Sequence, residues 1–256
     1  MVNKLKILVS IKQVPDINAS PNLNSNGIPE YDEKTVYVIN RYDEYALEEA
    51  LQLKDHGLTH CIHTISVGPG RVQKALRRSL EMGADEAFHI QTHDDGFDTP
   101  YIIAQAITQF AKKNYEIIFT GVMSEDAMNQ QTGQLIAAML GYNHATGVTE
   151  LSLINNTITI TRELDAQESL MYELPVPCVI SVQSSIHKPR YPSLSNVLRA
   201  RKQEIAILKP DIVIPIPKTK CYFTMPQKTT QCQFIEGSML QKVTELHAIL
   251  HKNTVL

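Results

Sequence analysis

The sequence of 256 residues contains no tryptophan, and only 6% of its residues are aromatic. It also lacks any apolar run near the roughly eighteen residues that a membrane-spanning helix needs. A formal net charge of -3 gives the chain no electrostatic reason to bind polyanions. These absences argue against a protein inserted in a membrane and against a nucleic-acid-binding protein.

Cysteine is scarce as well, with four in the chain. None has CxxC spacing and no histidine is placed to complete a metal site, so we expect reduced, mostly packed thiols and no metal. The start of the sequence leads directly into the apolar run 7–11 without the features of a signal or transit peptide. We therefore expect a cytoplasmic protein of a bacterium or archaeon, with the mitochondrial matrix less favoured.

The common phosphate-binding motifs are absent too. The chain contains neither GxGxxG nor GxxxxGK[ST], and it lacks the SGGxDS pattern of enzymes that split ATP between the alpha and beta phosphates. An adenylating enzyme would also need charged groups that stabilise the transferring group, and no such set is evident. We therefore predict no catalytic residues. A stand-alone nucleotide-binding module remains an alternative.

What the chain does contain is a regular alternation of two patterns. Short runs rich in branched residues indicate buried strands, and longer segments closed by glycine indicate helices. We expect strands at 6–11, 61–67, 86–90 and 115–120, and helices at 44–54, 72–82, 100–113 and 129–140. Asp43 is the N-cap candidate of the first of these helices. Such alternation predicts βαβ units. The expected fold class is doubly wound α/β, with a mostly parallel, Rossmann-like sheet.

The pattern changes after residue 146. Strands without intervening helices, and a tight-turn signal at Asn155-Asn156, predict an antiparallel meander. Beyond Pro210 the chain has too few apolar residues to build a core of its own. We therefore expect an α/β domain at 1–209 and a C-terminal arm at 210–256 that packs against a partner, although a disordered tail is the alternative. The remaining expected elements are strands at 151–154, 157–162, 169–174 and 175–182, a basic helix at 194–201, and a final helix at about 235–251.

Ligands of open parallel sheets bind beyond the carboxyl ends of the strands. The loop Ser66-Val-Gly-Pro-Gly70 is a weak candidate, because a purely structural turn would explain it equally well. The segment 121–134 is stronger, since it places hydroxyls, amides and a carboxylate between a strand and a helix, and its Gly133 permits close approach. Such a cluster can bind ribose, phosphate and base edges. An N-capping segment with solvated amides is the alternative.

Five segments, in order, resemble the beta (small) subunit of electron-transfer flavoproteins. They are Ile7 to Pro15, Asn40 to Ala50, Ala75 to Asp85, Asn129 to Gly133, and Lys188 to Lys202. The resemblance covers about residues 5 to 210 and implies an electron-carrier subunit rather than an enzyme. It implies a heterodimer in which the alpha subunit carries the redox-active FAD, whereas this chain holds a structural AMP.

The resemblance also implies which residues bind the cofactors. Tyr42 falls where an aromatic ring approaches the flavin of the partner. The whole implied set is Ser10, Asn40, Tyr42, Ser66, Val67, Val122, Asp126, Asn129, Gln130, Gln131, Thr132 and Gly133. Where many members have a lysine and further aspartates, this chain reads Gly121-Val-Met-Ser-Glu-Asp-Ala-Met128. The nucleotide is therefore AMP or, as in bifurcating relatives, a second FAD. Ala166-Gln167 also replaces the usual Gly-Gly of a turn.

The segment 187–202 resembles the family's recognition loop. There a leucine anchors into a pocket on an acyl-CoA or related dehydrogenase, and electrons then pass to a quinone oxidoreductase or another acceptor. The implied docking residues are Arg190, Tyr191, Leu194 and Asn196. The basic residues of this segment would steer the encounter with the partner. A solvated basic helix with Leu194 turned inward is the alternative.

Overall fold

The chain is described from a computed structural model. The structure describes residues 5–25, 27–92, 99–112, 114–154, 157–164, 168–184, 187–209, 223–225, 232 and 234–252. Contacts divide the chain into a first unit, Met1–Ser20 with Tyr31–Thr219, and a second unit, Pro21–Glu30 with Lys220–Leu256. Described elements of the second unit are the antiparallel strands β3 (Asn22–Leu23) and β4 (Pro29–Glu30) and the helix α6 (Met239–Lys252). The predicted packing of the arm on a partner stays a prediction.

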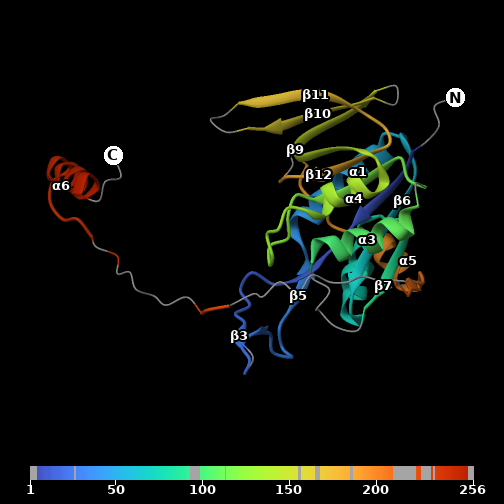
Figure 1. Ribbon diagram of the computed structural model, residues 1–256, viewed down its shortest axis with the longest axis horizontal. Helices are drawn as coiled ribbons and strands as arrows, with labels where there is room; N and C mark the ends of the chain where they lie inside the picture. The colour runs from blue at the N-terminus through green and yellow to red at the C-terminus, as the bar shows by residue number, and fades with distance from the viewer. Residues whose placement is uncertain are drawn as a thin grey trace. The chain divides into compact units, whose positions relative to one another are not determined.

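A nine-stranded sheet forms the centre of the first unit (Figure 1). Its strand order is β11-β10-β9-β12-β8-β1-β6-β7-β13. The strands from β9 to β13 in this order are parallel, and β9, β10 and β11 form an antiparallel meander. The predicted mostly parallel sheet with a meander is confirmed. The strands are β1 (Leu5–Ser10), β6 (Thr59–Gly68), β7 (Glu86–Gln91), β8 (Ile117–Gly121), β9 (Asn143–Ile154), β10 (Thr157–Glu163), β11 (Ser169–Pro175), β12 (Cys178–Val182) and β13 (Ala206–Leu208).

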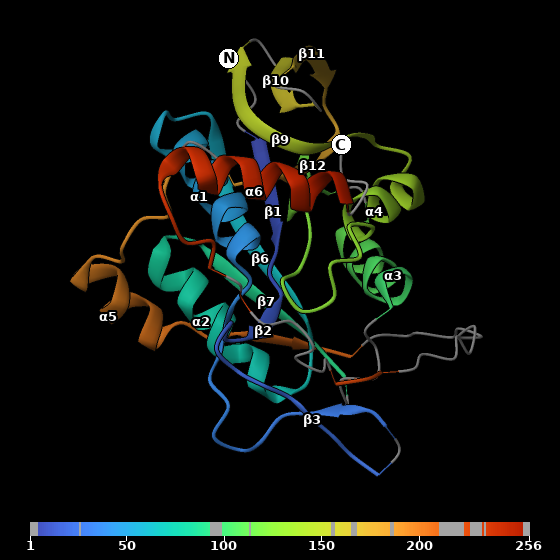
Figure 2. The same ribbon diagram turned by 90° about the vertical axis from the view of Figure 1, so that its left-hand side faces the viewer.

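Helices cover both faces of this sheet, α1 and α2 on one side and α3 and α4 on the other (Figure 2). Side chains of β1 alternate accordingly: Ile7 and Val9 pack with α1 and α2, whereas Leu8 packs with α3 and α4. The apolar side chains between the sheet and each pair of helices form two clusters, and the residues at the centre of each cluster are fully buried. The helices are α1 (Arg41–Asp55), α2 (Gln73–Met82) preceded by a 3₁₀ turn (Gly70–Val72), α3 (Pro100–Ala111), α4 (Thr132–Leu140) and α5 (Leu194–Lys202).

Several element boundaries differ from the sequence-based prediction, and three of the differences have a clear structural cause. Helix α1 begins at Arg41 after Asn40, so Asp43, expected as the N-cap, lies inside the first turn. Helix α4 begins three residues late because Met128 and Gln130 have positive φ angles, which a helix cannot contain. Strand β9 begins at Asn143 because its first half pairs in parallel with β12. The turns predicted at residues 155–156 and 166–167 lie outside the described residues.

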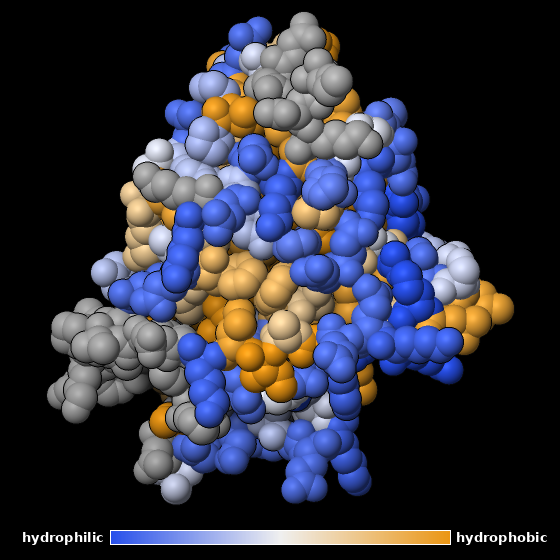
Figure 3. All heavy atoms as spheres, turned by 90° about the vertical axis from the view of Figure 1, so that its right-hand side faces the viewer, coloured by the Kyte–Doolittle hydropathy of each residue, from blue (hydrophilic) through white to orange (hydrophobic). Residues whose placement is uncertain are grey.

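The surface drawn in Figure 3 is mostly hydrophilic, with an apolar area near its centre. Within the described part of the chain, every helix is too short or too polar to cross a bilayer. The same residues contain no group of three His, Cys, Asp or Glu side chains arranged to hold a metal ion.

Candidate functional site

A cleft opens beyond the carboxyl ends of β1, β6 and β8. Strand β1 lies between β8 and β6, and the chain continues from β1 to β6 through α1 on one face and from β7 to β8 through α3 on the other. The strand order therefore reverses beside β1. This is the switch point at which open parallel sheets bind their ligands.

One wall of the cleft is apolar. Ile103 and Ile107 lie one helical turn apart on α3, and Pro100 begins the same helix. Val67 at the end of β6 and Val122 after β8 complete this wall. A flat aromatic ring can bury its faces against such branched side chains.

A second part of the lining is polar and belongs to the segment between β8 and α4. Asn129, Gln130 and Gln131 expose their amide groups there, and Thr132 begins α4. The first N–H groups of a helix have no partner within the helix, and its dipole favours negative charge at this end. This part of the lining can therefore bind an anion and several hydroxyl groups.

A lysine is part of the cleft lining. Lys12 follows β1, and its Nζ lies 2.8 Å from the carboxylate of Asp126 and 3.4 Å from Oγ of Ser124. The side chains of Lys12 and Asp126 are about one third and one fifth exposed. The cleft thus has a cation in its lining whose partner is accessible to water, so a bound anion can compete for it.

Gly133 lets α4 approach the sheet closely. The hydroxyls of Thr120 on β8 and Ser181 on β12 bond to each other at 2.9 Å, directly beneath Gly133. A Cβ atom at this position would collide with both hydroxyl oxygens. The glycine therefore fixes the start of α4 over the ends of β8 and β12.

The first turn of α1 ties the two loops of the cleft together. The Asn40 side chain donates to the carbonyl of Met123 (2.8 Å) and accepts from the N–H of Glu125 (3.1 Å). The two carboxylate oxygens of Asp43 accept from the N–H groups of Lys12 (2.7 Å) and Gly121 (2.9 Å). Because Asn40 and Asp43 are buried, these bonds determine the shape of the cleft.

Asp43 titrates near neutral pH. Burial raises its pKa to about 7, while the N–H donors of Lys12 and Gly121 and the charge of Lys12 act in the opposite direction. In the unfolded chain the pKa is near 3.8. Between these two pH values Asp43 is therefore protonated in the folded state and ionised in the unfolded state.

We expect the stability of the chain to fall as this proton is lost. Protonated Asp43 adds roughly 4 kcal/mol at most to the free energy of unfolding. This contribution is fully present below about pH 4 and is lost as the pH rises through 7. Asp43→Asn removes the titration. The melting temperature of the wild type should therefore fall relative to that of the variant between about pH 5 and pH 8. A difference that does not change with pH would mean that Asp43 is ionised throughout.

Most of the cofactor residues implied by the sequence lie together at this cleft. The lining includes Ser10, Asn40, Val67, Val122, Asn129, Gln130, Gln131 and Thr132. Gly133 follows Thr132 of the lining, and Asp126 is paired with Lys12 of the lining. Tyr42 lies in the first turn of α1, where its Cβ is close to Gly121. Ser66 is buried but does not line the cleft, because alternation along β6 turns it to the face opposite Ile65 and Val67. Their roles in binding stay predictions.

Sequence reasoning missed several residues of the site. Lys12 lies in the segment Ile7 to Pro15, two residues beyond β1, and a cation directly after a buried strand is the available signal. The pattern around Ile103 and Ile107 predicts a helix but no binding surface, although their spacing of four residues places them on one face. Asp43 reads as a cap because the predicted start of α1 is three residues too late.

The segment implied in docking combines exposed apolar side chains with internal anchors. Tyr191 is 93% exposed and Leu194 76%, so the alternative in which Leu194 is turned into the core is wrong. Ser193 caps α5 by accepting from the N–H of Asn196 at 3.2 Å.

Two arginines expected as steering charges point elsewhere. The guanidinium of Arg190 bonds to α1, and Arg199 donates to the carbonyls of Leu80 and Ala84 at the end of α2. Arg77 of α2 in turn donates to the carbonyls of Ala200 and Gln203 at the end of α5. Each of the two helices thus receives an arginine from the other at its C-terminus, where positive charge is favourable.

Comparisons with known proteins point to one family. The family model described as an electron transfer flavoprotein domain matches residues 30–213. The electron transfer flavoprotein subunit beta of Syntrophomonas wolfei is 34% identical over 79% of this chain and 79% of that protein. The protein of the same name from Bradyrhizobium diazoefficiens is 30% identical over 79% of this chain and 80% of its own length. The human one is 27% identical over 81% of this chain and 82% of its own.

Proposed function

Because this chain belongs to the electron transfer flavoprotein family, among the beta subunits, we propose that it holds a structural AMP and carries no catalytic residues of its own. In this proposal it pairs with an alpha subunit and helps to enclose the FAD that the alpha subunit carries. A dehydrogenase, of the acyl-CoA or a related type, docks on this chain and delivers electrons. A quinone oxidoreductase or another acceptor then receives them.

The observation that carries the AMP assignment is the chemistry of the cleft. Its apolar wall of Ile103, Ile107 and Val67 suits an adenine ring. The start of α4 and the ammonium of Lys12 suit a phosphate, and the exposed amides of the same loop suit ribose hydroxyls. The residues present therefore fit a nucleotide.

The FAD supplies the redox chemistry when it is bound by the alpha subunit. This chain contributes to it through the first turn of α1, where Tyr42 would approach the flavin. Asp43 and Asn40 hold that turn against the loop after β8. The nucleotide would stabilise this arrangement by binding the folded state in preference to the unfolded one.

Coexpression with candidate alpha subunits, followed by size-exclusion chromatography, tests the pairing. We expect a heterodimer that contains flavin, because the relatives are named as beta subunits of electron transfer flavoproteins. Denaturing this dimer and identifying the released nucleotides by mass should give AMP and FAD in equal amounts. Release of FAD alone, at two molecules per dimer, would indicate that a second FAD, as in bifurcating proteins, occupies the cleft in place of AMP. A chain that stays monomeric with every alpha subunit and releases no nucleotide would contradict the proposal.

A further inference from the structure

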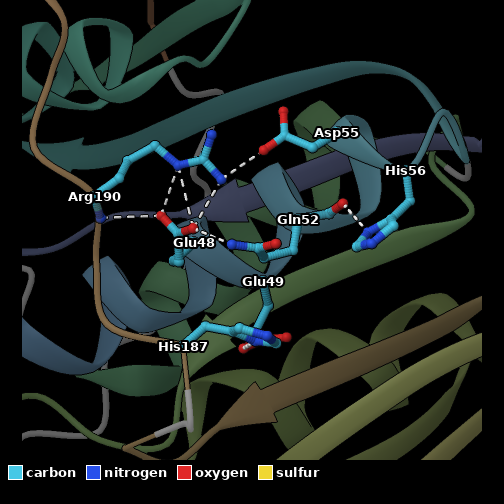
Figure 4. Close-up of polar contacts among 7 residues, drawn as sticks. All are labelled: Glu48, Glu49, Gln52, Asp55, His56, His187 and Arg190. Atoms are coloured by element: carbon cyan, nitrogen blue, oxygen red, sulfur yellow. Dashed lines mark hydrogen bonds and ion pairs between the residues drawn. The ribbon is translucent and has the colours of Figure 1, made fainter.

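Two adjacent glutamates of α1, Glu48 and Glu49, point toward the segment that precedes α5 (Figure 4). Their side chains are only 2% and 6% exposed. Buried carboxylates are rare in proteins unless they are paired, because leaving water costs several kcal/mol per ion. Neither glutamate touches the nucleotide cleft. A pair of buried charges outside the cleft therefore needs a different explanation.

Glu48 forms a complete set of bonds with Arg190. Its carboxylate accepts from Nε (2.9 Å) and Nη2 (2.8 Å) of Arg190, and also from the backbone N–H of Arg190 (3.1 Å). Gln52 donates a further bond at 2.7 Å, and the same guanidinium reaches Asp55 at 2.9 Å. The hydrogen bonds to Glu48 raise the pKa of Arg190 further above its usual range. Bidentate geometry fixes both the position and the orientation of the arginine.

Glu49 makes a second attachment one residue later. Nδ1 of His187 lies 2.8 Å from its carboxylate oxygen. The two attachments come from adjacent residues of one rigid helix, and they hold positions three residues apart in the segment (Figure 4).

The attached segment is not held in shape by regular secondary structure. Residues 187–193 form neither helix nor strand. Arg190 turns toward α1, whereas its neighbour Tyr191 and then Leu194 face water. The bonds between Arg190 and α1 thus determine which side chains of the segment are exposed to a partner. A docking surface that is already ordered loses less entropy when a partner binds.

We propose that Glu48 and Glu49 are positioning residues, which hold His187 and Arg190 so that Tyr191 and Leu194 are presented to an electron-donating dehydrogenase. The inference rests on the proposed function and deepens it. In this proposal Arg190 does not contact the dehydrogenase itself but holds the docking segment in place. It also gives α1 two roles, since its first turn shapes the nucleotide cleft and its later turns carry the docking segment.

Arg190→Gln tests the support. The variant heterodimer is reduced by an acyl-CoA dehydrogenase with its acyl-CoA, chosen because it reduces the wild type. We expect the KM for the dehydrogenase to rise roughly tenfold, while the maximal rate and the flavin content stay unchanged. Arg190→Lys keeps the charge but loses the paired Nε and Nη2 hydrogen bonds to Glu48, so its KM should lie between those of Arg190→Gln and the wild type. Arg78→Gln, which removes an arginine paired with Glu81 on α2, serves as the matched control with an unchanged KM.

A double variant separates this inference from the proposed function. If the arginine acts through Tyr191 and Leu194, Arg190→Gln should raise the KM by a smaller factor in the Leu194→Ala background than in the wild type. Additive effects, or an unchanged KM in Arg190→Gln when Leu194→Ala raises it, would overturn the positioning role and leave the docking proposal intact. An unchanged KM in Leu194→Ala itself would overturn the docking proposal.

Hydrogen exchange provides a readout that needs no dehydrogenase. In Arg190→Gln the amides of residues 187–196 should exchange faster, while those of α1 and α4 keep their protection. If Arg190→Gln does not fold, His187→Gln, which removes the second and more exposed attachment, should produce the same local pattern. Unchanged exchange in this segment in the folded variant would contradict the proposal.

Discussion

Replacing Gly121 with alanine is expected to destabilise the folded chain by about 3 kcal/mol and to reduce its nucleotide content. Gly121 ends β8 directly beneath the first turn of α1. A Cβ atom there would lie 2.5 Å from Oδ1 of Asp43 and 2.7 and 2.9 Å from the Cβ and carbonyl carbon of Tyr42. A backbone atom is among these neighbours, so rotating a side chain cannot relieve the collision. The helix must shift, and the bond from the N–H of Gly121 to Asp43 lengthens.

Chemical denaturation and the mass of released nucleotide measure both effects. Gly70→Ala is the matched control, because a Cβ atom at Gly70 has open space around it. Alanine lowers the entropy of the unfolded chain at both positions, which by itself stabilises by about 0.4–1 kcal/mol. The control should therefore be neutral or slightly stabilised. A Gly121→Ala protein as stable as the control, with full nucleotide content, would show that α1 does not need to lie this close to β8.

Replacing Leu194 with alanine should give the largest effect on electron delivery. A central apolar anchor in an interface typically contributes about 2 kcal/mol or more, so the KM for the dehydrogenase should rise on the order of thirtyfold. Because Leu194 is exposed in the first turn of α5, the melting temperature, flavin content and nucleotide content should hardly change. A core leucine truncated in the same way would destabilise the chain by roughly 2–5 kcal/mol.

Steady-state reduction of the heterodimer by the dehydrogenase, with thermal melting of the same samples, measures the contrast. Leu170→Ala removes another exposed leucine, on β11 at the opposite edge of the sheet from β13, and should leave the KM unchanged. Exposed charges such as Arg201 and Lys202 should affect mainly the salt dependence of the rate. Equal effects of Leu194→Ala and Leu170→Ala would place the docking site elsewhere.

The sequence predicts the fold well because its strongest signals are local. Branched runs such as 7–11 and 117–120, and helices closed by Gly83 and Gly141, alternate so regularly that a parallel sheet with helices on both faces is the consistent solution. The same rule about the carboxyl ends of strands places the loop 121–133 at the cleft before any coordinates are known. The resemblance to a family then assigns the nucleotide to it.

The features that sequence reasoning misses depend on contacts between distant segments. Asp43 reads as a cap because the pattern around it is that of a helix start, whereas its actual partners lie on the loop after β1 and at the end of β8. Arg190 and Arg199 read as surface charge because composition cannot show which carboxylate or carbonyl lies opposite. The first half of β9 is polar, and only its pairing with β12 makes it a strand.

The position of β12 has a consequence for the growing chain on the ribosome. This strand comes late in the sequence but lies between β8 and β9, in the middle of the sheet. Until residues 178–182 have been synthesised, the facing edges of β8 and β9 have no partner to bond their backbone groups. Unpaired strand edges are where nascent chains associate wrongly, and late, non-local pairing slows folding. A chain interrupted shortly before Cys178 would therefore have nearly all of its core residues and still be prone to aggregate.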